Sequence, residues 1–281
     1  MIKNTIVCVK WGDKYGREYV ERLKEQVEKN CSIPFNFYCL TDNPVEDYDL
    51  YLPIVWNNYE NGNFWAYRKF YMFKEKSIRR IFFPGERIHQ DIHLIDGEHF
   101  LYLDLDVIIQ HDLKYFFELD MERPYIVKGW WNDIEVCKKN FVNYQSPMIN
   151  SSVIRWDKGQ MEEVYEHVST NLDILFFTYP TIDNYLNHFF YDIYEEDETQ
   201  NFFNVFPEGD IYSWYKGNVF PDDMEPKKKR EECKICLFNN SGEDNDTEEL
   251  RSIYTRNGKR LEECNQLHRW LYGEESLGFF E

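Results

Sequence analysis

Two acidic residues, Asp104 and Asp106, stand two positions apart directly after the apolar run 100–103. In open α/β sheets, ligands bind beside the carboxyl ends of the strands. Carboxylates at such a place can hold a hard divalent cation, which can in turn bridge the oxygens of a diphosphate. Two surface carboxylates that merely end a strand produce the same pattern, so the pair alone leaves both interpretations open.

A second group of candidate ligands consists of sulfur and imidazole side chains. Cys233 and Cys236, together with Cys264 and His268, are residue types that suit a zinc site. Cys236 lies inside the apolar run 235–238, however, where a small buried cysteine needs no metal. We therefore expect a structural role for it. The 7 cysteines are odd in number and scattered, which does not indicate a disulfide framework.

The acidic pair needs a scaffold, and strand and helix patterns alternate through the N-terminal part of the chain. Short apolar runs predict strands, and apolar residues at three- and four-residue spacing predict helices. Strands are predicted at 5–10, 35–40, 50–56, 100–103, 125–129, 153–156 and 235–238. Helices are predicted at 15–29, 63–76, 160–170, 182–190 and 261–272. This alternation favours an α/β fold with a mostly parallel sheet covered on both faces.

Several segments, taken together, resemble nucleotide-sugar glycosyltransferases of the GT-A fold, of the family-8 type. The first two are the aromatic-rich segment 64–73, which carries Lys69, and the Tyr-Leu-Asp-x-Asp strand that begins at Tyr102. Four more follow in the same order, at 150–157, 183–186, 213–216 and 235–238. The resemblance implies a Rossmann-like GT-A domain with a mixed, mostly parallel sheet over residues 1–242. An acidic loop and a C-terminal helical extension would follow over residues 243–281.

The resemblance implies a place for the nucleotide at the ends of the first two strands. The residues that would contact the base and the ribose are Lys10, Trp11, Asp13, Tyr15, Thr41 and Asp42. An ordinary strand-to-helix turn at the first place, and a turn before Pro44 at the second, would account for the same residues without a ligand.

Further residues would contact the diphosphate or the sugar. They are Lys69, Asp104, Leu105, Ser151, Ser152 and Lys216. Asp183 would orient a sugar or acceptor hydroxyl, or act as the general base if the enzyme inverts the anomeric configuration. Two plainer interpretations stand beside these: Lys69 as a solvated helix lysine, and Asp183 as an acidic residue that stabilises the first turn of a helix.

The resemblance also implies a Mn²⁺ or Mg²⁺ ion, held by Asp104, Asp106 and a third ligand directly after the last strand. The family has a histidine at that third place, whereas this chain has Asn239. An Asn carbonyl oxygen is an acceptable ligand for either ion, although it is weaker than imidazole for Mn²⁺.

The charge of the chain limits its partners. The formal net charge is -19 at pH 7, and phosphate backbones repel such a protein unless a basic patch is segregated. The basic run 227–230 is followed by two glutamates and indicates a solvated loop. We therefore expect no nucleic-acid partner. The N-terminus predicts no signal peptide and no run predicts a transmembrane segment, so we expect a cytoplasmic protein.

These observations lead to one expected function and two alternatives. The expected function is a metal-dependent transfer of a sugar from a nucleoside-diphosphate sugar, with UDP favoured, to a hydroxyl of a glycan or small acceptor. The resemblance favours retention of the anomeric configuration. A haloacid-dehalogenase-type phosphatase would instead use Asp104 as its nucleophile, with Asp106 in the same motif and Asp222-Asp223 as its late acidic pair. The second alternative is a non-catalytic relative that binds nucleotide sugars.

Overall fold

The computed structural model describes most of the region before residue 238. The described residues are 2–12, 15–51, 64–74, 95–129, 134–140, 147–172, 175, 178–179, 181–195, 200–213 and 232–237. The predicted helix at 261–272 and the predicted extension over 243–281 lie outside them.

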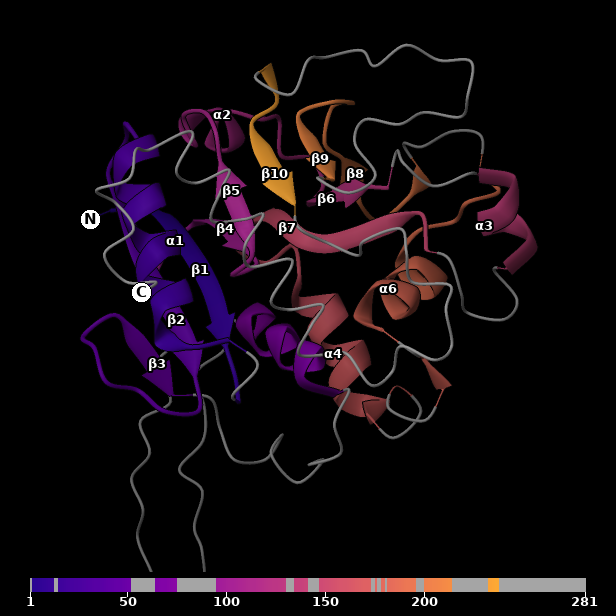
Figure 1. Ribbon diagram of the computed structural model, residues 1–281. Helices are drawn as coiled ribbons and strands as arrows, with labels where there is room; N and C mark the ends of the chain where they lie inside the picture. Colours follow the sequence, from indigo (N-terminus) through magenta and orange to yellow (C-terminus); the bar gives the residue numbers. More distant parts are fainter. Residues whose placement is uncertain are drawn as a thin grey trace, which may run out of the picture.

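A seven-stranded sheet with the order β3-β2-β1-β4-β7-β6-β8 forms the centre of the described fold (Figure 1). Its strands are β1 (Asn4–Lys10), β2 (Phe35–Thr41), β3 (Asp49–Tyr51), β4 (His99–Leu103), β6 (Tyr125–Lys128), β7 (Ile149–Asp157) and β8 (Asn204–Val205). β7 is antiparallel to both of its neighbours, and the other pairs are parallel. The sheet is therefore mixed and mostly parallel, as predicted.

A smaller sheet begins where β4 ends. β10 (Ile235–Leu237) lies in its middle, antiparallel to β5 (Val107–Ile109) and parallel to β9 (Ile211–Ser213). Only the three residues from Asp104 to Asp106 separate β4 from β5. The acidic pair therefore occupies the connection between the two sheets.

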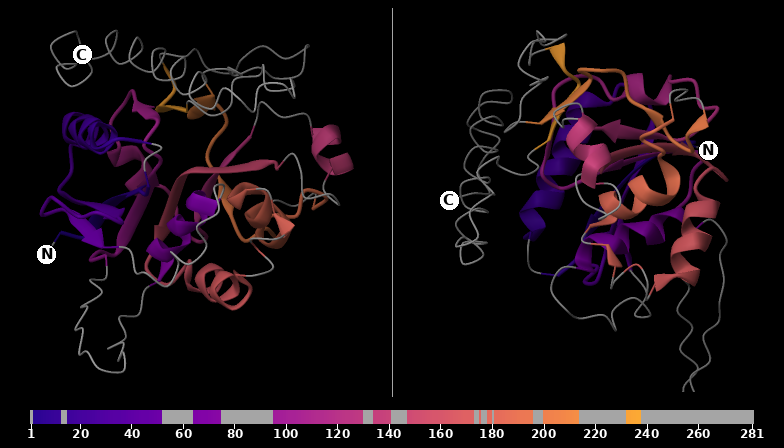
Figure 2. Two further views of the ribbon diagram at one scale, coloured as in Figure 1. Left: turned by 60° about the horizontal axis from the view of Figure 1, so that its bottom comes forward. Right: turned by 90° about the vertical axis from the view of Figure 1, so that its right-hand side faces the viewer.

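Helices cover both faces of the large sheet (Figure 2). α1 (Arg17–Asn30) and α2 (Lys114–Phe117) pack on one face together with the small sheet. The 3-10 helix η2 (Phe64–Phe73), α4 (Glu162–Thr170) and α6 (Ile182–Phe190) pack on the other face. The short helix α3 (Ile134–Asn140) places Cys137 beside this second group.

The strands divide their side chains between two hydrophobic cores. Ile6 and Cys8 of β1 belong to the core under α1, whereas Val7 between them belongs to the core under η2, α4 and α6. β4 does the same, with Leu101 and Leu103 on the first face and Tyr102 on the second. This period of two is the alternation of a strand that is buried on both faces.

The segment predicted as a helix at 63–76 is a 3-10 helix in the structure, and the spacing of its rings explains why. Tyr67, Phe70 and Phe73 recur every three residues and are all buried. Their ring centroids lie 6.2 Å and 6.1 Å apart in succession. A helix with three residues per turn stacks these rings in one row against the core.

Other elements differ from the predictions in length. β7 extends over Ile149–Asp157 rather than 153–156, and of the predicted strand 50–56 the described part is β3. The short elements α2, α3, β5, β8 and β9 were not predicted. Within the described residues, no helix combines the length and the apolar character needed to cross a membrane.

Candidate functional site

The turn that carries the acidic pair is fixed from two sides. The Asp104 main-chain N–H donates to the Ser152 carbonyl of β7 at 2.8 Å. From α1, Arg22 Nη2 donates to the Leu105 carbonyl at 3.4 Å. Gln26 Oε1 accepts from the Ile109 N–H at 2.9 Å. The turn and the strand after it are therefore held through their main-chain groups. The two carboxylates make separate contacts.

Asp104 presents its two carboxylate oxygens differently. Oδ1 accepts from Lys69 Nζ at 3.3 Å and from the Tyr102 hydroxyl in a short hydrogen bond. Oδ2 has no hydrogen-bond partner among the described residues. The Asp104 side chain is 26% exposed, whereas that of Lys69 is 7% exposed. Asp104 can therefore offer one oxygen to a ligand while its other oxygen stays anchored.

Asp106 is anchored by a tyrosine from the segment before α1. The Tyr15 hydroxyl donates to Asp106 Oδ2 at 2.8 Å, and the Tyr15 ring contacts Tyr19 edge-on at 4.8 Å between centroids. Burial raises the pKa of Tyr102 well above its ordinary value, and Asp104 and Asp106 raise it further. Tyr102 therefore stays protonated and remains a donor to Asp104.

Asp183 lies in the first turn of α6, whose N-cap Thr181 accepts from the Asn184 N–H at 3.2 Å. Its Oδ1 accepts from the Ser151 main-chain N–H at 2.9 Å and from Ser151 Oγ at 2.5 Å. Its Oδ2 accepts from Asn150 Nδ2 at 3.1 Å. Burial raises the pKa of Asp183, while the Lys69 charge and the Ser151 hydrogen bonds oppose that rise. The carboxylate is therefore desolvated and at the same time held firmly in place.

Lys69 contacts both Asp104 and Ser151, the residue that binds Asp183. Its Nζ donates to Ser151 Oγ at 2.9 Å and to the Ser151 carbonyl at 3.2 Å, besides its contact with Asp104. It also lies 5.1 Å from the centroid of the Tyr102 ring. The alternative of a solvated helix lysine does not hold, because Lys69 is buried among these acceptors.

The predicted nucleotide residues lie at the ends of the adjacent strands β1 and β2. Lys10 Nζ donates to the Gly12 carbonyl at 2.7 Å, and the Gly12 N–H donates to Asp42 Oδ2 at 3.2 Å. Gly12 has a φ of 61°, a left-handed conformation that favours glycine. Thr41 is buried, and its hydroxyl donates to Asp42 Oδ1 at 3.4 Å. The turn after β1 is thus tied to the turn after β2.

Arg68, the neighbour of Lys69, reaches this second region. Its guanidinium lies 3.9 Å from the centroid of the Trp11 ring and therefore covers one face of that ring. Burial lowers the pKa of Arg68 to about 10, and the nearby Asp42 opposes this change. A base at this place would meet the edge or the other face of Trp11.

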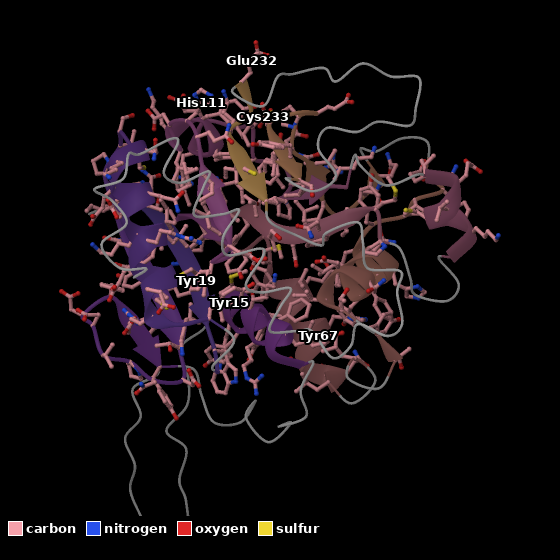
Figure 3. The ribbon with its side chains drawn as sticks, in the orientation of Figure 1. Tyr15, Tyr19, Tyr67, His111, Glu232 and Cys233 are labelled. Carbon is pink, nitrogen blue, oxygen red and sulfur yellow. The ribbon has the colours of Figure 1, made fainter. Side chains whose placement is uncertain are left out.

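The structure brings most of the predicted residues to one edge of the sheet. Figure 3 shows Tyr15 and Tyr67 toward the edge where β1 ends, whereas His111 and Cys233 lie at the opposite edge. Leu105 has a buried side chain, so only its main chain could contact a ligand. Ser152 is also buried, and its carbonyl is the acceptor for Asp104.

Some predicted residues cannot be placed. Asp13, Lys216, Asn239, the pair Asp222-Asp223, Cys264 and His268 lie outside the described residues. Cys233 and Cys236 are both buried. Within the part of the chain that the structure describes, no group of three or more His, Cys, Asp or Glu residues could hold a metal ion. A cation at Asp104 and Asp106 would need further ligands from elsewhere.

Three residues of the site were missed by the sequence reasoning. Tyr102 lies two positions before Asp104, and the period of two in a strand could have shown that both side chains point the same way. Asn150 begins the segment already singled out, and it binds Asp183. The contact of Arg68 with Trp11 had no signal in the sequence, because it depends on how η2 packs against the end of β1.

No protein-family model matches this sequence, and no curated protein matches it. The galactosyltransferase LgtC, in complex with donor and acceptor sugar analogs, superposes with a TM-score of 0.50 and 11% identity over 91% of this chain and 95% of that chain. An active-site mutant of LgtC gives 0.51 and 12%, over 91% and 95%. A glycosyltransferase involved in glycosylation of the major capsid of PBCV-1 gives 0.48 and 16%, over 92% and 99%.

At these identities the likeness shows the fold. The chain has the mixed α/β fold of LgtC, with a seven-stranded, mostly parallel sheet between layers of helices. The GT-A fold class predicted from the sequence is confirmed.

Proposed function

We propose that this protein is a glycosyltransferase. It transfers a sugar from a nucleoside-diphosphate sugar, with UDP favoured, to a hydroxyl group of a glycan or a small acceptor. The observation that carries the proposal is the meeting of Asp104, Asp106, Lys69 and Asp183 beside the end of β4, on a fold shared with LgtC. Ligands of open α/β sheets bind at this place.

The acidic pair is the proposed site of Mn²⁺ or Mg²⁺. Mg²⁺ is commonly held by one or two carboxylates together with the phosphates of a substrate, which fits a pair with one oxygen of Asp104 unengaged. Asn239 is the proposed third ligand. A cation bound here would stabilise the negative charge that develops on the departing diphosphate. In a chain with a net charge of -19, it would also offset repulsion of that diphosphate.

Asp183 is proposed to orient a hydroxyl group. A carboxylate has about four acceptor sites, and Ser151 and Asn150 fill three of those on Asp183. The remaining acceptor position on Oδ2 can take one hydrogen bond from a sugar or acceptor hydroxyl. Lys69 is proposed to attract the diphosphate of the donor through its positive charge. Lys10, Trp11, Tyr15 and Asp42 would hold the nucleoside.

Calorimetric titration of UDP, GDP, CDP and their sugar conjugates, with Mn²⁺ or Mg²⁺ and then with EDTA, tests the proposal. We expect one diphosphate to bind in the presence of the cation and to dissociate when EDTA is added. Asp106→Ala should abolish this cation-dependent binding and leave the thermal unfolding transition unchanged. Asp120→Ala, which removes an exposed carboxylate elsewhere, is the matched control and should bind as the wild type does.

The possible outcomes separate the alternatives. Full cation-dependent binding by the Asp106→Ala protein would contradict the metal assignment. Nucleotide-sugar binding without transfer to any hydroxyl acceptor would indicate a non-catalytic relative. If no nucleotide binds, the phosphatase becomes the better interpretation, and a panel of phosphate esters would test it.

A further inference from the structure

Four side chains form a continuous line of polar contacts through the interior of the site. Asp104 contacts Lys69 at 3.3 Å, Lys69 contacts Ser151 Oγ at 2.9 Å, and Ser151 Oγ contacts Asp183 at 2.5 Å. Lys69 and Ser151, the two inner members, are buried, at 6% and 2% exposure. The line joins η2, the end of β4, the start of β7 and the first turn of α6.

The chemistry of these groups fixes the direction of each hydrogen bond. A lysine ammonium group can only donate, and a carboxylate can only accept. The Ser151 hydroxyl must therefore accept from Lys69 and give its own proton to Asp183. No other arrangement satisfies both neighbours. The hydroxyl therefore links Lys69 to Asp183, beside the main-chain bonds from Lys69 to the Ser151 carbonyl and from the Ser151 N–H to Asp183.

We propose that Ser151 is a positioning residue that couples the cation-binding carboxylate Asp104 to the substrate-orienting carboxylate Asp183 through Lys69. This inference rests on the proposed function, because it assigns a connection between two parts of the same site. A cation on Asp104 Oδ2 would weaken the attraction between this carboxylate and Lys69, whose other hydrogen bonds go to Ser151. Asp183 would then be held more firmly.

Thermodynamic linkage makes this coupling reciprocal. If cation binding at Asp104 strengthens the hold on Asp183, the negative charge of Asp183 must strengthen cation binding by the same factor. Without that charge, Lys69 would be attracted more strongly to Asp104 and would compete with the cation there. Burial strengthens the effect, because charges are screened less in the interior than at the surface.

A double-mutant cycle on the full chain tests the coupling, with Mn²⁺ alone as the probe. Binding is followed by the loss of the electron paramagnetic resonance signal of free Mn²⁺, and only binding that is absent in the Asp106→Ala protein is counted. We expect Asp183→Asn to weaken Mn²⁺ binding by about fivefold or more, the lower end of common coupling factors. In the Ser151→Ala background the same change should weaken binding by less than about twofold.

Two further variants separate positioning from a general loss of structure. Ser151→Thr keeps a hydroxyl group and should restore the coupling, whereas a purely structural role would not depend on that group. Ser169→Ala removes an exposed hydroxyl from α4 and should leave Mn²⁺ affinity unchanged. Thermal unfolding of every variant shows whether it is folded.

The results distinguish this inference from the proposed function. Equal effects of Asp183→Asn with and without the Ser151 hydroxyl, in a protein that binds Mn²⁺ through Asp106, would overturn the coupling and leave the proposed function standing. If the wild type binds no Mn²⁺ through Asp106, the coupling is overturned, whereas the metal assignment is judged by the titration in which UDP and the cation are present together.

Discussion

The Asp183 carboxylate shows how opposing effects act on a single residue. Burial disfavours its charged form, and this effect raises its pKa. The Lys69 charge and the Ser151 hydrogen bonds favour the charged form but do not reverse the rise. Keeping an ionised acceptor at this place therefore lowers the free energy of unfolding. Such a cost is typical of groups kept for function.

The raised pKa of Asp183 predicts a pH dependence of stability. Between the ordinary Asp value of 3.8 and the raised value, the folded state binds more protons than the unfolded state. The Asp183 contribution to the free energy of unfolding must therefore fall as the pH rises through this range. We expect the stability of the wild type relative to Asp183→Asn to decrease from pH 4 toward neutrality. Urea unfolding of both proteins at several pH values measures the difference.

The opposite trend would be an increase in the stability of the wild type relative to Asp183→Asn as the pH rises. It would show that the hydrogen bonds to Asp183 outweigh its burial. Asp120→Asn is the matched control, since that carboxylate is exposed. Its stability relative to the wild type should change little over the same range of pH.

A local sequence pattern indicates some residues of the site and not others. Asp104 and Asp106 could be found because their position after an apolar run is a local property. The anchors of those carboxylates could not: Tyr15 reaches Asp106 from another segment, and Lys69 reaches Asp104 from η2. Such contacts depend on the packing of elements that are distant in the sequence, which a local pattern does not contain.

Among the elements, α1 does more than cover the sheet. Its polar residue Gln26 is 1% exposed and serves the main chain of β5, accepting from the Ile109 N–H at 2.9 Å and donating to the Val107 carbonyl at 3.4 Å. Arg22 of the same helix binds the Leu105 carbonyl. α1 therefore supports the strand and the turn on either side of Asp106.

Replacing Gln26 by Ala should destabilise both the fold and the cation site. The change leaves a buried main-chain N–H and a buried carbonyl without their partners, which costs about 1–3 kcal/mol for each unsatisfied group. We expect the midpoint of urea unfolding to fall. Mn²⁺ affinity should fall with it, because β5 begins directly after Asp106 and fixes that end of the turn.

Gln160→Ala provides the matched control for this change. Gln160 also binds main-chain groups, accepting from the Asp157 N–H at 2.8 Å and donating to the Met121 carbonyl at 2.6 Å, but it lies beyond the far end of β7. It should lower stability without changing Mn²⁺ affinity. Equal losses of affinity in the two variants would contradict a specific role for α1.

Elements with a strong internal pattern were predictable. α6 matches its predicted bounds, because its apolar spacing and its N-terminal Thr181 are both local signals. β8 and β9 were missed because two or three residues carry no period of their own, and such strands exist through pairing with β6 and β10. The 3-10 form of η2 was missed because a three-residue spacing of aromatic rings also fits an α-helical pattern.

At the scale of the whole molecule, the net charge of -19 opposes the approach of any anionic substrate. The field of such a protein extends about 30 Å at 0.01 M salt but only about 8 Å at physiological salt. The site itself contains Lys69, Lys10 and Arg68, whose charges act at short range. Long-range repulsion and short-range attraction therefore compete.

This competition predicts how salt affects the binding of UDP without a divalent cation. We expect affinity to increase when NaCl is raised from about 0.01 M to about 0.15 M, because screening removes the long-range repulsion first. Calorimetry at several salt concentrations measures this, and uridine, which has no phosphate charge, is the control and should show no trend. A decrease for UDP would mean that the local cations dominate at every ionic strength.

The antiparallel pairing of β7 with β4 has a consequence for how this sequence can change in length. β7 carries Asn150 and Ser151 at its start, and its Ser152 carbonyl anchors Asp104. Side chains alternate along a strand, so gaining or losing one residue within β7 would turn Ser151 away from Asp183. In the turn after β7, a Cβ added at Gly159 would meet no atom within 4 Å. Natural insertions and deletions are therefore expected to gather in that turn and to spare the strand.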